Sequence, residues 1–220
     1  MLDSFYMTLE RLSQLSGGPR LLQDCSRRQD WPNRGVYFFF EEGEMRSNGP
    51  ALPRVVRVGT HGITLGSKST LYGRLVQHRG NRSGSGNHRG SVFRRHIGKA
   101  LIARQAINCI TWGVGSNAPL DVRLAEKPIE LQVSRYLGRM SVLCLRIVDD
   151  TGPNSLRAYI ERNSIGLLAG KEPASRSWLG SFTANPNIIR SHLWNVNHID
   201  HAPERDFLKA LENLVEHHAV

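Results

Sequence analysis

A run of aromatic and β-branched residues, residues 35–40 (GVYFFF), constrains the fold of this chain more than any other feature. Such residues favour β-strands, and a run without a charged interruption is typical of a buried strand. Residues 54–60 (RVVRVGT) predict a second strand. A loop of about a dozen residues separates the two segments, which is short enough for antiparallel pairing.

Helical periodicity begins soon after the second strand. Leu71 and Leu75 recur at helical spacing behind Ser69 or Thr70 as N-cap, which predicts a helix that closes near Gly80. The order of strand, strand, helix, helical insertion, strand and helix is typical of the α+β class. Further predicted elements are helices over 5–16, 91–106, 119–139 with a bend or restart around Pro128, 156–170 and 206–217, a strand over 141–148, and mostly irregular structure over 171–201.

We interpret residues 1–220 as a single domain, because the chain contains no internal repeat and no linker-like segment. The predicted fold is a small α+β core with a mainly antiparallel three-stranded sheet flanked by helices, with helical insertions and N- and C-terminal helical extensions. Segments of about 34–80 and 141–170 form the core, a basic helical insertion covers about 81–140, and a C-terminal extension covers 171–220.

The sequence lacks the signals of a membrane protein or of a disulfide-stabilised protein. No stretch approaches the roughly 18 apolar residues of a transmembrane helix, and the N-terminus has no basic region followed by an apolar one. Cys25, Cys109 and Cys144 are far apart and form no C-x-x-C pattern, which argues against a disulfide framework or a zinc ribbon. We therefore expect a cytoplasmic protein with no membrane partner.

The charge of the chain points to a polyanionic partner. Lys and Arg number 29 against 19 Asp and Glu, a net charge of +10. Most of the basic residues are arginines, whose planar guanidinium can hold a phosphate through two hydrogen bonds, so nucleic acid is the natural candidate. Residues 78–104 contain no acidic side chain and predict a surface that follows a phosphate backbone. The expected DNA contacts are Arg82, Arg89, Arg94, Arg95 and Lys99.

Three segments place polar groups where a plain core would not. Tyr37 stands among phenylalanines in the first strand, although a core tyrosine whose hydroxyl reaches the surface gives the same pattern. Arg74 and His78 lie one helical turn apart, either on a solvated face or around a bound anion. Glu161 lies among arginines on a later helix, where an ordinary salt bridge is the alternative to a functional role.

Taken together, these landmarks resemble the GIY-YIG nuclease superfamily. Its core has a G-[IV]-Y strand, a second strand ending in Y-[IV]-G, a helix with an Arg and often a His one turn later, and a Glu on a helix after the third strand. The chain offers Gly35-Val36-Tyr37, Arg57-Val58-Gly59, Arg74 with His78, and Glu161 in this order. The restriction-endonuclease branch is indicated by GVYFFFE, the R-x-x-x-H helix, NHRGSVFR, Trp178-Leu179-Gly180 and Leu193-Trp194-Asn195.

The resemblance implies a metal-dependent endonuclease that hydrolyses phosphodiester bonds in double-stranded DNA, as a restriction or defence enzyme. Glu161 would hold Mg²⁺ (or Mn²⁺), because such cations prefer oxygen ligands. Arg74 would neutralise the charge that grows on the scissile phosphate. Tyr37 and His78 are alternative bases for the attacking water, and the sequence leaves the choice open. A palindromic target would favour a homodimer.

Two departures from the family pattern leave other functions open. Arg57 stands where the second signature tyrosine would be, so the role of that phenol is lost or passes to His61 or to Arg57 itself. The family also tends to place an Asn after the Glu, and the sequence does not assign one among Asn185, Asn187 and Asn195. The alternative function is a non-catalytic or degenerate nucleic-acid-binding protein.

A metal cluster of histidines is a third and weaker hypothesis. The spacings of these residues fit no standard zinc pattern. The cluster would use His88, His96, His192, His198 and His201.

Overall fold

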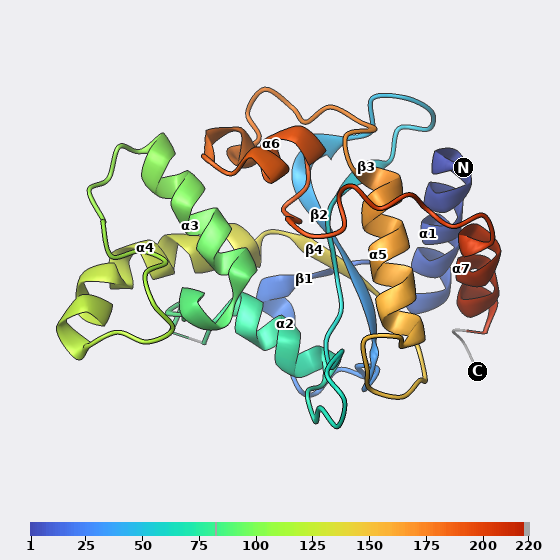
Figure 1. The fold of residues 1–220 in the computed structure, drawn as a ribbon, viewed down its shortest axis with the longest axis horizontal. Helices are drawn as coiled ribbons and strands as arrows, with labels where there is room; N and C mark the ends of the chain where they lie inside the picture. The colour runs from blue at the N-terminus through green and yellow to red at the C-terminus, as the bar shows by residue number, and fades with distance from the viewer. Residues whose placement is uncertain (82, 218–220) are drawn as a thin grey trace.

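The computed structural model describes residues 1–81 and 83–217, and these residues contain a four-stranded antiparallel sheet (Figure 1). The predicted α+β class and the antiparallel pairing of the first two long strands are confirmed. A fourth strand joins the three that were predicted, because a two-residue segment pairs with the edge of the last strand. The strands are β1 (Arg20–Leu21), β2 (Gly35–Met45), β3 (Pro53–Gly59) and β4 (Ser141–Arg146), in the order β1-β4-β2-β3.

Both faces of β2 are buried, which is why its sequence is an unbroken apolar run. Successive side chains of a strand point to opposite faces. Val36 and Phe38 accordingly lie in one hydrophobic core, and Tyr37 and Phe39 lie in the other. The predicted functional tyrosine therefore lies on one defined face of the sheet.

Two groups of helices cover these two faces and lie on opposite sides of the sheet in Figure 1. The face of Tyr37 is covered by α2 (Leu71–Arg79), α3 (Val92–Arg104) and α4 (Leu120–Gly138). The other face is covered by α1 (Leu2–Ser16), α5 (Leu156–Leu168) and α7 (Phe207–Glu216).

Local capping explains where the helices of the core begin. Thr70 caps α2 by accepting a hydrogen bond from Gly73 N at 3.1 Å, and Ser155 caps α5 in the same way. The helix α4 runs through Pro128 without a break. Its buried Ile129 and Val133 pack in the core and hold the helix in place around the proline.

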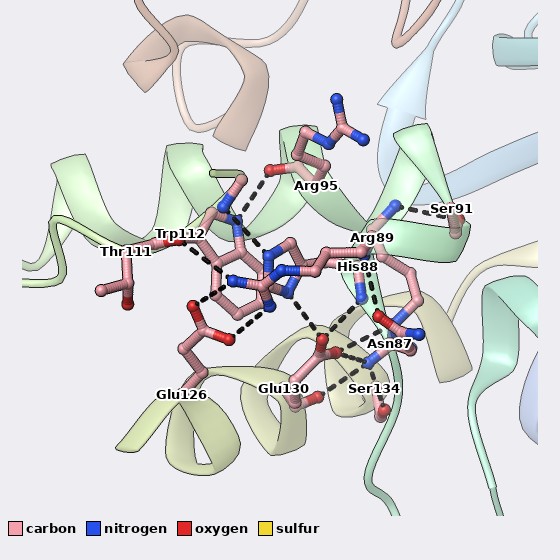
Figure 2. A network of polar contacts seen from close by, with 12 residues as sticks. Asn87, His88, Arg89, Ser91, Arg95, Thr111, Trp112, Glu126, Glu130 and Ser134 are labelled. Atoms are coloured by element: carbon pink, nitrogen blue, oxygen red, sulfur yellow. Dashed lines mark hydrogen bonds and ion pairs between the residues drawn. The ribbon is translucent and has the colours of Figure 1, made fainter. Parts of the chain in front are cut away.

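A buried polar network organises the basic insertion (Figure 2). The short helix η2 (His88–Gly90) lies against α4 and the turn that precedes it. The His88 ring stacks on Trp112 at 3.8 Å, and His88 Nδ1 lies 2.9 Å from Glu130 Oε1. The Arg89 guanidinium donates two hydrogen bonds to Glu126, at 2.6 and 2.9 Å. A well-satisfied network of this kind favours one arrangement of the insertion.

The region 171–201, predicted to be mostly irregular, contains two short helical segments and covers the outer edge of the sheet. The two segments are η3 (Leu179–Phe182) and α6 (Pro186–Ser191). A third short helix, η1 (Leu22–Asp24), lies elsewhere in the chain, directly after β1. Trp194 N donates to Val56 O at 2.8 Å, which occupies a backbone acceptor on the edge strand β3. No helix within the described residues is long and apolar enough to span a membrane.

Candidate active site

The phenol of Tyr37 lies at the centre of the candidate site. It is buried, and the register of the sheet places it opposite Gly59 at the end of β3. A Cβ atom at Gly59 would lie only 2.3 Å from Tyr37 Oη, so this position must lack a side chain. Gly35 has a similar packing reason, because a Cβ atom there would lie 2.2 Å from Leu145 O. Gly59 thus leaves room for the Tyr37 ring, and Gly35 allows the close approach of the neighbouring strand β4.

The imidazole of His78 lies next to the Tyr37 phenol. Its Nε2 atom is 2.9 Å from Tyr37 Oη, and its Nδ1 atom is 2.8 Å from the hydroxyl oxygen of Ser91. Burial, followed by the positive charges of Arg74, Arg57 and Arg94, holds the pKa of His78 well below its ordinary value. The imidazole is therefore neutral, and its two ring nitrogens are both engaged.

Arg57 lies beside the same phenol. Its guanidinium stacks over the ring of Phe93 at 4.6 Å and donates to Trp194 O at 2.8 Å, and it is close enough to interact electrostatically with Tyr37. Burial lowers the pKa of Arg57, while the charges of Tyr37 and Glu161 oppose that effect. Its Nε atom is buried without a hydrogen-bond partner within the described residues. The residue that replaces the second signature tyrosine is thus a buried cation next to the first.

Glu161 reaches the end of β3 from α5. Its Oε1 atom accepts a hydrogen bond from Thr60 N at 3.1 Å, and the Thr60 hydroxyl donates to Gly35 O at 2.8 Å. Burial raises the pKa of Glu161 above its ordinary value, against the opposing effects of Arg57, the Thr60 N–H and Arg74. A bound cation would favour the ionised form of this carboxylate.

Arg74 completes the cluster from α2. It is half-buried, its Nη1 atom donates to Gln77 Oε1 at 2.9 Å, and its Nε atom has no hydrogen-bond partner among the residues described. It is close enough to act electrostatically on Arg57, His78 and Glu161. The structure therefore brings together the five side chains that the sequence singled out, from two strands and two helices.

His61, the other candidate for the missing phenol, is engaged elsewhere. Its Nδ1–H donates to Ser69 O at 3.1 Å, in the loop that leads to α2. Burial and the neighbouring Arg157 lower the pKa of His61 to about 4. Arg57 therefore interacts electrostatically with Tyr37, whereas the hydrogen-bonding nitrogen of His61 faces Ser69.

The side chains of the three asparagines considered from sequence all form hydrogen bonds with backbone groups. Asn195 accepts from Val58 N at 3.0 Å and donates to Val58 O at 2.8 Å, so its amide extends the edge of β3. Asn185 caps α6, and Asn187 donates to Val196 O. None of these amides is free to complete the cluster around Tyr37 in this arrangement.

The arginines of the basic segment divide into buried and accessible residues. Arg89 is paired with Glu126, and Arg94 is fully buried with its Nε atom 3.0 Å from Glu130 Oε2. Their guanidinium groups point into the protein, so they hold the insertion together and are not available to a phosphate. Lys99 is exposed and Arg95 is half-buried. Arg82 lies outside the described residues.

Ser91 was predicted only as the start of a helix, but it also contacts the site. It caps α3 by accepting from Arg94 N at 3.3 Å, and the same oxygen lies against His78. Arg94 donates to His78 O at 2.9 Å and to Arg79 O at 3.2 Å, which secures the end of α2. Sequence spacing gave no indication of these contacts, because His78 and Ser91 are on different helices.

The donor set fits a cation that takes most of its ligands from water and phosphate. Within residues 1–81 and 83–217, no group of three or more His, Cys, Asp or Glu side chains could hold a metal ion. The hypothesis of a histidine cluster is therefore not supported. Glu161 offers one hard carboxylate oxygen donor, and Mg²⁺ is commonly bound by one or two carboxylates together with waters and phosphates.

The chain matches the family model of the GIY-YIG domain over residues 1–220. No curated protein and no solved structure gives a significant match. The family match extends beyond the core segments recognised from sequence and includes the insertion and the C-terminal region. The chain belongs to the GIY-YIG domain family.

Proposed function

We propose that this protein is a metal-dependent endonuclease that hydrolyses phosphodiester bonds in double-stranded DNA. The family suggests a nuclease. The observation that carries the proposal is the convergence of Tyr37, Arg57, Arg74, His78 and Glu161 at one end of the sheet.

Two arginine N–H groups of the cluster that lack hydrogen-bond partners within the described residues support a phosphate substrate. Arg57 Nε and Arg74 Nε are both buried without hydrogen-bond partners within the described residues. An unsatisfied buried donor is costly, and an anion placed between such donors would remove that cost. Arg74, at the rim, is proposed to stabilise the charge on the scissile phosphate in the transition state.

Water activation is assigned to the Tyr37–His78 pair. Both side chains are buried, and Tyr37 Oη lies 2.9 Å from His78 Nε2. Glu161 would hold Mg²⁺ or Mn²⁺, which when bound polarises the phosphate and lowers the pKa of a bound water. Arg57 is proposed to hold Tyr37 in place and to add positive charge near the phosphate.

DNA binding is proposed for the accessible part of the basic segment. Arg95 and Lys99 lie on α3. The Phe93 ring of the same helix stacks against the Arg57 guanidinium. Arg95 and Lys99 are therefore on the element that borders the cluster. The role as a restriction or defence enzyme, the core and insertion boundaries, and a homodimer on a palindromic target remain part of this proposal.

A non-catalytic or degenerate nucleic-acid-binding protein is the second candidate. The observation that favours it is Arg57, a buried cation in the position where the family pattern has a phenol. Binding without hydrolysis would survive removal of the divalent cation.

The test is incubation of the purified protein with duplex DNA of varied sequence in Mg²⁺ or Mn²⁺, with EDTA as control. We expect discrete products that require the cation. The variant Glu161→Gln should abolish cleavage and leave DNA binding intact or stronger, because one negative charge near the phosphates is removed. Cleavage that persists in this variant would exclude Glu161 as the metal ligand, and binding with no cleavage under any condition would favour the second candidate.

A further inference from the structure

Ser91 and His78 form a buried contact that the family assignment does not explain. Both side chains are fully buried, and the Ser91 oxygen lies 2.8 Å from His78 Nδ1. The opposite ring nitrogen of His78 faces Tyr37 Oη at 2.9 Å. Which nitrogen carries the proton decides whether His78 donates to the phenol or accepts from it.

The hydrogen-bonding capacity of Ser91 decides between the two tautomers. Its oxygen already accepts from Arg94 N, at 3.3 Å. Within residues 1–81 and 83–217, His78 Nδ1 is the hydrogen-bond acceptor that the Ser91 hydroxyl contacts. If Nδ1 carried the proton, the buried Ser91 O–H would have no acceptor, which typically costs about 1–3 kcal/mol. The satisfied arrangement has Ser91 donating to Nδ1, which leaves the proton of neutral His78 on Nε2.

We propose that Ser91 is a positioning residue that fixes His78 as its Nε2–H tautomer, so that His78 donates a hydrogen bond to Tyr37 Oη. The Arg57 guanidinium on the neighbouring strand adds positive charge beside the same phenol. The phenol oxygen then accepts a hydrogen bond from His78, and its own proton is directed away from that donor. A donated hydrogen bond and a nearby positive charge both favour a phenolate over a phenol. Resting on the proposed function, this inference assigns the base to Tyr37 and makes His78 its hydrogen-bond donor.

The charges around His78 are consistent with a neutral donor. Arg57 on β3, Arg74 on α2 and Arg94 on α3 all face it with positive charge. Each of these groups disfavours a second proton on the ring. The base is then the Tyr37 phenolate, which forms when the phenol proton leaves to solvent. The proton that this phenolate takes from water resides on Tyr37 and does not pass to Nε2, which is already protonated.

The direct test is the nitrogen NMR spectrum of the full-length protein labelled with ¹⁵N-histidine, with the His78 signals assigned by their loss in His78→Gln. We expect a protonated Nε2 and an unprotonated Nδ1. A protonated Nδ1 in the parent protein overturns the proposal. This measurement needs no catalytic activity, so it separates a failure of this inference from a failure of the proposed function.

Two substitutions test the consequence for the reaction. Ser91→Asp keeps a good N-cap for α3 but can only accept, so it should move the proton to Nδ1. Single-turnover cleavage should then fall by about tenfold or more, as loss of a supporting hydrogen bond commonly does, with DNA affinity unchanged. Ser91→Thr, which retains the hydroxyl, is the matched control and should stay near the parental rate. If Ser91→Asp moves the proton and cleaves as fast as the parent, the role assigned to Ser91 is wrong.

Discussion

Gly59→Ala provides a sharp test of how the two strands position the phenol. An ideal Cβ atom at this residue would lie 2.3 Å from Tyr37 Oη and 2.4 Å from Cζ. Non-bonded carbon contacts are optimal at about 3.5–4.0 Å, so the ring must move by about 1 Å or more. The bond from Tyr37 to His78, now 2.9 Å long, cannot survive such a displacement unchanged.

The expected effect on catalysis is larger than the effect on stability. A displacement of about 1 Å in an active site can cost about a hundredfold in rate, and overpacking a core typically costs about 1–3 kcal/mol. Single-turnover cleavage and thermal denaturation would measure the two effects. The control is Gly90→Ala, because a Cβ atom there would lie 4.0 Å from Asn87 Nδ2, an ordinary van der Waals distance. A parental cleavage rate in Gly59→Ala would refute the placement of Tyr37 in the reaction.

Three further predictions follow from the site and the insertion. Arg74→Ala should lower the single-turnover rate by about a hundredfold with little effect on DNA affinity; an equal loss of both would show that Arg74 acts only in binding. Arg57→Tyr should raise the single-turnover rate if the site is a weakened nuclease. If the guanidinium supports Tyr37, Arg57→Tyr and Arg57→Ala should each lower this rate by more than tenfold. Unchanged rates in both variants would show that β3 does not contribute to the active site. For Glu130, burial alone would raise the pKa, but bonds from His88 and Arg94 lower it overall. The stability that the ionised Glu130 contributes is present at neutral pH and is lost as the pH falls below about 4.3. Glu130→Gln should therefore weaken this acid dependence and lower the free energy of unfolding in urea by about 3–5 kcal/mol. An unchanged urea midpoint would contradict a stabilising role of the network.

DNA affinity should depend on the accessible cations of α3 and not on all basic residues. Arg95→Ala and Lys99→Ala should each weaken binding and reduce the salt dependence of the binding constant by roughly one unit of slope. Lys209→Ala removes the same charge from α7, on the opposite face of the sheet, and should leave both quantities unchanged. Equal effects of all three substitutions would show that net charge, and not this surface, governs binding.

Local patterns in the sequence were enough to determine the main strands and helices of this fold, although not the short elements β1, η3 and α6. The apolar run of β2 and the spacing of Leu71 and Leu75 behind Thr70 involve neighbours within a few residues. Such signals specify which face of a strand or helix is buried, because side-chain directions repeat every 2 or about 3.6 residues. The order of the short motifs along the chain was likewise sufficient to recognise the family.

Only the tertiary structure decided which partner each buried group meets. The sequence presented Arg94 as a surface cation, but α4 brings Glu130 beside it from 36 residues away and turns it inward. It presented Ser91 as a helix cap, whereas the packing of α2 against α3 places the same oxygen on His78. Periodicity along one element gives the direction of a side chain but contains no information on the charges that a distant element supplies. A buried arginine or hydroxyl is stable only where its donors and acceptors are matched, and that match exists only once the chain has folded.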